Sequence, residues 1–130
     1  MEGTSSKRPL TGQKILIVED EEILAWSIGF ELEFMQAKVN IVHSLGEAKI
    51  TFEKFKPDIV ICDASLPDGH CFKIVKDWQK TANDLKTVLM SANKFGFTDE
   101  SKEITYSKFL QKPFKMSDLL SSVEKCCCTV

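Results

Sequence analysis

The stretch from Lys14 to Glu22 places a short run of branched apolar residues directly before a run of acids. Residues 15–18 include no polar residue, which is typical of a strand buried on both faces in a parallel sheet. The next four residues, 19–22, all carry carboxylates. Such a cluster repels itself unless protons or cations balance its charge. We therefore expect a buried parallel strand that ends at a cation-binding edge.

Similar apolar runs recur along the chain, and helical patterns separate them. Further strands are predicted at residues 39–41, 59–62, 87–90 and 109–110. Helices are predicted over 22–36, from the N-cap Ser44 to about residue 55, over 72–78, within 93–107, and after the N-cap Ser117. Five strands alternating with five helices predict an α/β protein with a doubly wound parallel sheet covered on both faces.

Length, charge and cysteine content narrow the class of protein. The 130 residues suit one domain, predicted over 14–128 after a flexible tail at 1–13. A net charge of −2 gives no support for nucleic-acid binding, and no apolar run is long enough to span a membrane. The five cysteines show neither a disulfide framework nor zinc-ligand spacing, so we expect reduced thiols and a cytoplasmic location.

Polar residues with reactive side chains follow four of the five predicted strands. They are Glu19 and Asp20 after the first strand, Asp63 after the third, Ser91 after the fourth and Lys112 after the fifth. The carboxyl ends of parallel strands lie at one edge of a sheet, where ligands bind in this fold class. We therefore expect three carboxylates, a hydroxyl and an ammonium group to converge there.

This combination of groups suits phosphoryl chemistry. Clustered carboxylate oxygens are ligands for Mg²⁺ or Mn²⁺, and a metal ion together with a lysine can stabilise the oxygens of a transferring phosphoryl group. A carboxylate can itself be the nucleophile and form an acyl phosphate. Asp63, between the metal ligands and Lys112, is the candidate nucleophile, and Ser91 is placed to hydrogen-bond the phosphoryl group.

The motifs "ILIVED", "DIVICDASLPDG", "VLMSA" and "FLQKPF" together resemble the receiver domain of bacterial two-component response regulators. The resemblance covers about residues 14–125. It implies a flavodoxin-like (βα)5 three-layer sandwich with strand order 2-1-3-4-5. It also implies a signalling switch that catalyses only its own phosphotransfer and dephosphorylation, rather than a conventional enzyme.

The resemblance assigns roles around the acceptor. Asp63 would receive a phosphoryl group from a sensor histidine kinase or a histidine phosphotransfer protein. Asp20 would bind the metal directly, Glu19 would act through water, and the Ser65 backbone carbonyl would be a further ligand. Lys112 would pair with the acceptor and then with the phosphoryl group, and a cis Lys112-Pro113 bond is expected.

The resemblance also implies how the signal leaves the site. Ser91 and Phe109 occupy the two switch positions, which bias the surface of the fourth helix, fifth strand and fifth helix. Ser65 and Asn93 occupy the positions that tune the dephosphorylation rate. The output partner, or a C-terminal effector domain absent from this chain, is left open.

The helix predicted at residues 22–36 carries two apolar stripes. One is expected to face the sheet and contains Leu24, Ile28, Leu32 and Met35. The other lies nearly opposite and contains Ile23, Trp26, Phe30 and Phe34. The family docks kinases beside this helix, so Trp26 and Phe30 are candidate docking residues; the alternative is that the aromatic side chains fold onto neighbouring elements.

Several features depart from the family pattern. Cys71 stands where glycine is usual, so the sequence does not define the backbone conformation there. His70 is either a neighbour of the phosphoryl group or a loop residue without such a role. The segment 94–107 is shorter and more polar than usual, and the run Cys126–Cys128 is expected at an exposed helix end. A phosphorylation-independent pseudo-receiver that binds partners remains the alternative function. Ser65 argues against an aspartyl phosphatase, which needs an acid at that position.

Overall fold

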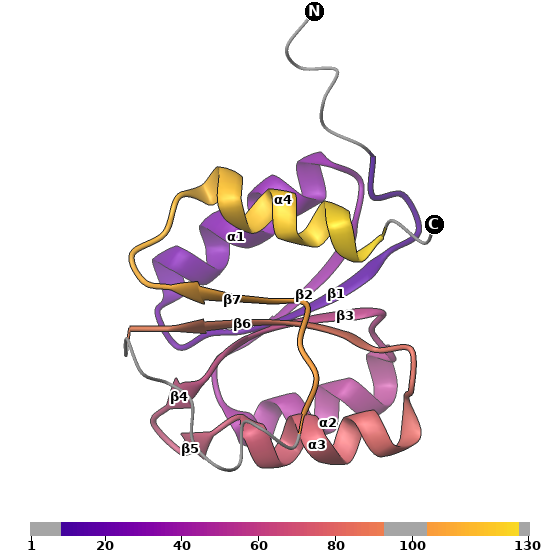
Figure 1. Ribbon diagram of the computed structural model, residues 1–130, viewed down its shortest axis with the longest axis vertical. Helices are drawn as coiled ribbons and strands as arrows, with labels where there is room; N and C mark the ends of the chain where they lie inside the picture. The colour runs from indigo at the N-terminus through magenta and orange to yellow at the C-terminus, as the bar shows by residue number, and fades with distance from the viewer. Residues whose placement is uncertain (1–8, 93–103, 128–130) are drawn as a thin grey trace, which may run out of the picture.

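The computed structural model describes residues 9–92 and 104–127, and it contains a five-stranded parallel sheet between two layers of helices (Figure 1). The strand order is β2-β1-β3-β6-β7, which is the predicted order 2-1-3-4-5 counted within this sheet. The strands are β1 (Lys14–Val18), β2 (Lys38–Val42), β3 (Ile59–Asp63), β6 (Lys86–Ser91) and β7 (Lys108–Gln111). The predicted flavodoxin-like α/β fold is therefore confirmed.

Each face of the sheet is covered by two of the described helices (Figure 1). On one face lie α1 (Glu22–Phe34) and α4 (Met116–Cys126), and on the other lie α2 (Leu45–Phe55) and α3 (Phe72–Thr81). Alternate residues of β1 enter the two cores, with Ile15 and Ile17 under α1 and Leu16 and Val18 facing α2. This double burial explains why the strand sequences have no polar alternation. None of the helices in the described ranges is long and apolar enough to cross a membrane.

Helix α1 approaches the edge strand β2 closely because Gly29 has no side chain. A Cβ at this position would lie 3.0 Å from Cδ1 of Ile41 and 3.5 Å from Cγ1 of Val39. The sheet-facing stripe of α1 is thus formed by buried Ala25, Ile28, Gly29 and Leu32. Leu24, predicted to face the sheet, is only partly buried.

The helix ends confirm one predicted cap and contradict another. Oγ of Ser44 accepts a hydrogen bond from the backbone N–H of Glu47 at 3.1 Å, as predicted. The Glu47 carboxylate accepts from the N–H of His43 rather than from that of Ser44. The prediction that Ser117 caps the last helix was wrong, because α4 begins at Met116 and its N-cap is Lys115.

The loop that follows the acceptor forms a small hairpin, which was not predicted. Strands β4 (Ser65–Leu66) and β5 (Gly69–His70) pair antiparallel around the turn. Gly69 has φ of 138°, whereas Cys71 has φ of −75° and needs no glycine. The unusual Cys71 therefore leaves the local backbone unstrained, because Gly69 adopts the left-handed conformation instead.

Both ends of the described chain pack more tightly than predicted. Leu10 is 1% exposed and its N–H donates to the carbonyl of Met35 at 2.7 Å, so packed structure begins before the predicted boundary at residue 13. Cys126, the last residue of α4, is buried in the core, which corrects the expectation of an exposed position. Most of the predicted helix within 93–107 lies outside the described residues, and so does the predicted site residue Asn93.

Candidate functional site

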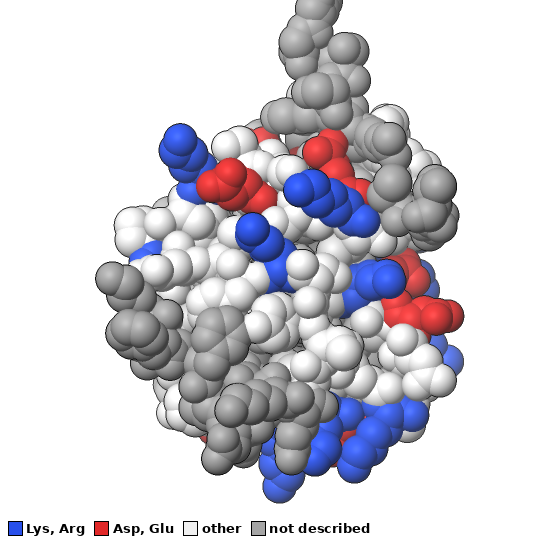
Figure 2. Space-filling view, viewed as in Figure 1, with Lys and Arg blue, Asp and Glu red and all other residues white. Residues whose placement is uncertain are grey.

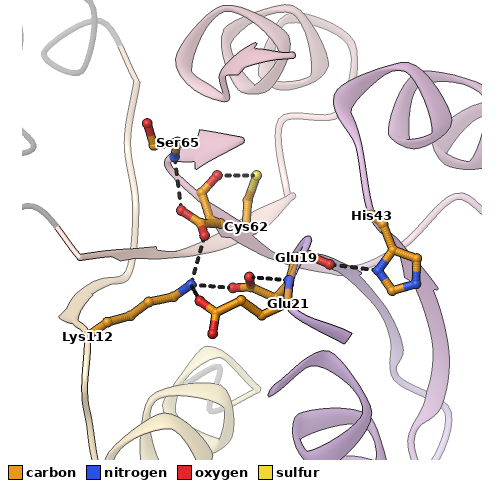
Figure 3. Close-up of polar contacts among 7 residues, drawn as sticks. Glu19, Glu21, His43, Cys62, Ser65 and Lys112 are labelled. Carbon is orange, nitrogen blue, oxygen red and sulfur yellow. Dashed lines mark hydrogen bonds and ion pairs between the residues drawn. The ribbon is translucent and has the colours of Figure 1, made fainter. Parts of the chain in front are cut away.

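The carboxyl edge of the sheet brings together the residues predicted from the strand ends. Parallel pairing aligns Val18 of β1 with Cys62 of β3, so Glu19, which follows β1, and Asp63, which ends β3, lie at the same edge of the sheet. Figure 3 shows Lys112 reaching across from the end of β7 toward Glu19. The Lys112-Pro113 peptide bond is cis, as expected. Lys112 also contacts Glu21, so residues 91 positions apart in the sequence meet at this site.

The ammonium group of Lys112 lies among three carboxylates. Its Nζ is 2.7 Å from Oε1 of Glu19, 2.8 Å from Oδ2 of Asp63 and 3.1 Å from Oε2 of Glu21. Burial lowers the pKa of Lys112, but its contacts with the carboxylates of Asp63, Glu19 and Glu21 more than offset this effect, so the pKa lies above its ordinary value. The lysine is therefore a permanent cation of the site.

Both carboxylate oxygens of Asp63 have defined partners. Oδ2 accepts from Nζ of Lys112, and Oδ1 accepts from the backbone N–H of Ser65 at 3.0 Å. The next residue, Ala64, donates its N–H to the carbonyl of Met90 at 2.7 Å, which ties the loop to β6. The Asp63 side chain is only 8% exposed, so a donor could reach it only from the open edge of the sheet.

Glu19 is fully buried, although it is the first member of the acid run. Its Oε2 accepts from the N–H of Glu21 at 2.9 Å, while Oε1 forms the ion pair with Lys112 but accepts no well-directed hydrogen bond. Burial raises the pKa of Glu19 to about 7, against the opposing effects of Lys112 and the Glu21 amide; the nearby Asp63 charge raises it further. A further cation at this position would stabilise the ionised carboxylate.

These features fit a divalent cation. Glu19, Asp20 and Asp63 each offer a carboxylate oxygen, and these atoms lie within 4.8 Å of one another. Asp20 is exposed, whereas the other two are buried, so the group opens toward solvent on one side. A hard, all-oxygen donor set with room for water suits Mg²⁺ or Mn²⁺. Oε1 of Glu19 already has a cationic partner in the Lys112 ammonium at 2.7 Å, so the case for a metal depends on the three-carboxylate donor set.

Two residues of the site were missed by the sequence analysis. Glu21 provides the third carboxylate around Lys112, and His43 places Nδ1 2.8 Å from the backbone carbonyl of Glu19 (Figure 3). Glu21 lies in the acid run, but nothing in its spacing distinguishes it from Glu22. His43 directly follows β2, and its position at a strand end was the signal that could have identified it.

The remaining predicted residues take varied positions around the site. Ser91 is buried at the end of β6, where its carbonyl accepts from the N–H of Lys112 at 2.7 Å. Phe109 is half-buried on β7, with its ring 6.4 Å from that of Tyr106. Ser65 contacts Asp63 through its N–H. His70 is exposed on β5 and does not belong to the carboxylate group.

The second apolar stripe of α1 is exposed. Ile23 is 83% exposed, Trp26 64%, Phe30 54% and Phe34 79%. Trp26 and Phe30 stack on each other, with ring centroids 5.4 Å apart, and a groove of about 160 Å³ lies between them and β2. The stacked pair remains exposed instead of folding onto neighbouring elements.

Comparison with known proteins agrees with this fold and site. The model of the response regulator receiver domain matches residues 15–124, and the chain belongs to this family. Proteins of the family are signalling switches of two-component systems. The chain is 29% identical over 113 residues to the response regulator protein GraR of Staphylococcus aureus, covering 85% of this chain and 50% of that protein. It therefore spans about half the length of the curated relatives it matches.

Solved receiver domains share the architecture. The non-phosphorylated HemR receiver domain of Leptospira biflexa is 26% identical with a TM-score of 0.80, covering 91% of this chain and 96% of that one. A CheY-like receiver domain of Methylobacillus flagellatus is 26% identical with a TM-score of 0.76, covering 88% and 98%. The predicted resemblance to response regulator receivers is thus confirmed.

Proposed function

We propose that this receiver domain accepts a phosphoryl group on Asp63 from a sensor histidine kinase or a histidine phosphotransfer protein. The observation that carries the proposal is the position of Asp63, held by the Ser65 amide on one oxygen and by Lys112 on the other. Family membership and the adjacent carboxylates of Glu19 and Asp20 support it. We place this reaction in the cytoplasm, where such donors act.

In the proposed reaction, a carboxylate oxygen of Asp63 attacks phosphorus, the phosphorus–nitrogen bond of the donor histidine breaks, and an acyl phosphate forms. The Lys112 ammonium lies beside the acceptor before the reaction and can pair with the phosphoryl oxygens afterwards. Ser91, at the end of the neighbouring strand, provides a hydroxyl for a further phosphoryl oxygen. Hydrolysis of the acyl phosphate restores the carboxylate, at a rate tuned by Ser65 and Asn93.

A bound Mg²⁺ or Mn²⁺ would neutralise charge on the phosphoryl oxygens. Asp20 and Asp63 would hold it directly, together with the backbone carbonyl of Ser65, and Glu19 would act through water. The three carboxylates already lie close enough to share one ion. The all-carboxylate donor set, with Asp20 exposed and Glu19 and Asp63 buried, is the strongest support for this assignment.

The switch is proposed to act through Ser91 and Phe109. A new dianion at Asp63 would draw the Ser91 hydroxyl and Lys112 toward it, and the half-buried Phe109 would repack on β7. A groove of about 950 Å³ runs beside Phe109 between β7 and α4, and it offers a surface on which such repacking would be felt. The output partner, or an effector domain beyond this chain, would recognise that surface.

The experiment that tests the proposal is intact-mass measurement after incubation with Mg²⁺ and acetyl phosphate. We expect the wild type to gain one phosphoryl group and Asp63→Asn to gain none, while the exposed control Asp77→Asn behaves as wild type. Labelling of Asp63→Asn would contradict the acceptor assignment. Absence of both labelling and Mg²⁺ binding in the wild type would favour the pseudo-receiver, whereas binding without labelling would indicate a strict need for a kinase.

We also propose that the phosphodonor protein docks on the exposed stripe of α1. Trp26 and Phe30 present a stacked aromatic surface near the acidic edge, and such surfaces often mark partner sites. Trp26→Ala and Phe30→Ala should slow labelling by a histidine kinase but leave labelling by acetyl phosphate unchanged. Ile50→Ala, which alters an equally exposed apolar residue on α2, is the matched control. Equal kinase rates in all variants would refute docking at this stripe.

A further inference from the structure

Glu19 is held on three sides by the residues around it. Its N–H donates to the carbonyl of Val42 at 3.0 Å, and its Oε2 accepts from the N–H of Glu21. Its carbonyl accepts from Nδ1 of His43 at 2.8 Å (Figure 3). The last contact differs from the other two because its donor is a side chain, that of His43, which lies 24 residues further along the chain, directly after the edge strand β2.

We propose that His43 is a positioning residue for the cation site, because it fixes the peptide plane between Glu19 and Asp20. This inference rests on the proposed function, in which these two carboxylates hold Mg²⁺. A carbonyl oxygen only accepts hydrogen bonds, so Nδ1 of His43 must carry the proton of this contact. The direction of the Glu19 carbonyl is therefore defined by the imidazole ring.

The peptide plane matters because it determines where Asp20 points. The carbonyl of Glu19 and the N–H and Cα of Asp20 belong to one rigid plane, so a rotation of the carbonyl would also turn Asp20. Within the described ranges, no hydrogen bond restrains the exposed Asp20 carboxylate itself. Its direction toward Glu19 and Asp63 thus depends on the backbone that His43 holds.

His43 is itself well placed to hold that backbone. Its N–H donates to Oε1 of Glu47 at 2.8 Å, and the preceding residue, Val42, is aligned with Val18 at the end of β1. The following residue, Ser44, caps helix α2. The histidine is therefore fixed between a strand end and a helix start, and little additional ordering is needed for its ring to bind Glu19.

The test compares Mg²⁺ affinity, by titration calorimetry, in the wild type, His43→Ala, His43→Asn and the exposed control Asn40→Ala. Loss of a hydrogen bond that orients a metal ligand commonly weakens metal binding by about 10–100-fold. The His43 hydrogen bond acts on the backbone rather than on a ligand side chain, so we expect a loss of about 3–10-fold for His43→Ala. His43→Asn should recover most of the affinity, since the asparagine amide nitrogen can occupy the place of Nδ1. Acetyl phosphate labelling should slow in parallel.

A readout in the metal-free protein separates this inference from the proposed function. Hydrogen exchange of the Glu21 amide, which donates to Glu19, should be faster in His43→Ala than in the wild type and should be restored in His43→Asn. If the wild type neither binds Mg²⁺ nor accepts a phosphoryl group, the proposed function fails, and this exchange measurement alone decides whether His43 positions the loop.

The inference is overturned if His43→Ala matches the wild type in both Mg²⁺ affinity and exchange. It is also overturned if His43→Asn is as impaired as His43→Ala, because the donor at Nδ1 would then not be the cause. If His43→Ala fails to fold, His43→Leu supplies the bulk of the ring without a donor, and its comparison with His43→Asn gives the same decision.

Discussion

Replacing Glu19 with glutamine should stabilise the metal-free protein above pH 7 and have little effect below pH 4.5. Burial raises the pKa of Glu19 to about 7 from its ordinary 4.5. Because the folded pKa is higher than the unfolded one, the folded state binds a proton more tightly. The wild type is therefore favoured at low pH and loses this stability as the pH rises from about 4.5 to about 7.

The size of the effect follows from the shift in pKa. The two pKa values differ by roughly 2.5, and at about 1.4 kcal/mol for each tenfold change this amounts to about 3.5 kcal/mol in the free energy of unfolding. Glutamine at residue 19 never ionises, so Glu19→Gln should be more stable than the wild type by up to about this amount at pH 8. The advantage should disappear near pH 4.5.

Urea unfolding in the presence of a chelator, at half-unit steps from pH 4.5 to 8, measures this difference. Glu53→Gln on α2, which changes an exposed glutamate, serves as the control. Adding Mg²⁺ at pH 8 should stabilise the wild type much more than Glu19→Gln. A difference between the two proteins that stays flat across this pH range would refute the claim that Glu19 is a buried, costly charge.

Three further predictions concern other parts of the molecule. The pKa of Asp68 lies below its usual value because its carboxylate accepts hydrogen bonds from the N–H groups of Leu45 and Gly46. Asp68→Ala should therefore lower the melting temperature at pH 7, and the difference from the wild type should vanish as acid protonates Asp68. Equal melting curves at pH 7 would contradict this prediction. Gly29→Ala should reduce the free energy of unfolding, measured by urea titration, by about 1 kcal/mol. The new methyl group would crowd Ile41 at a cost of about 1–3 kcal/mol, which outweighs the gain of about 1 kcal/mol in helix propensity. A stabilised variant would show that α1 can move away from β2. Cys62 and Cys71, both fully buried, should react with a thiol reagent only after unfolding, and rapid reaction of the native protein would argue against their burial.

Figure 2 shows one face of the molecule on which lysines and acids are interspersed among uncharged residues in the upper part, with a group of lysine or arginine side chains at the lower edge. This lower edge corresponds to the layer of α2 and α3 in Figure 1. On this face, therefore, basic side chains gather over the layer of α2 and α3, although the net charge of the whole chain is −2.

Much of the fold could be predicted because buried parallel strands leave a strong pattern. Residues 15–18 and 59–62 are apolar throughout, since both faces of each strand are covered. The meeting of Glu19, Asp63 and Lys112 followed from one rule, that the carboxyl ends of parallel strands share an edge. Their mutual contacts in the structure agree with that expectation.

The features that could not be predicted all depend on contacts between separate segments. Asp68 caps α2 from a hairpin on another part of the chain, and Leu10 enters the core ahead of the first strand. Ser117, by contrast, had a good local cap pattern, but the N-cap is Lys115, two residues earlier. Local patterns define which element forms, whereas its ends depend on the neighbours that satisfy its free backbone groups.

The sequence alone determined the order of the five strands of the sheet and of the four described helices, and the identities of the acids, hydroxyl and lysine at the strand ends, because periodicity and strand ends are local properties of the chain. Only the tertiary structure decided that Glu21 joins Lys112, that His43 binds the carbonyl of Glu19, and that Glu19 loses its contact with water. These outcomes depend on how loops from different strands pack at one edge, where burial changes the charge balance of a carboxylate that the sequence presents like its neighbours.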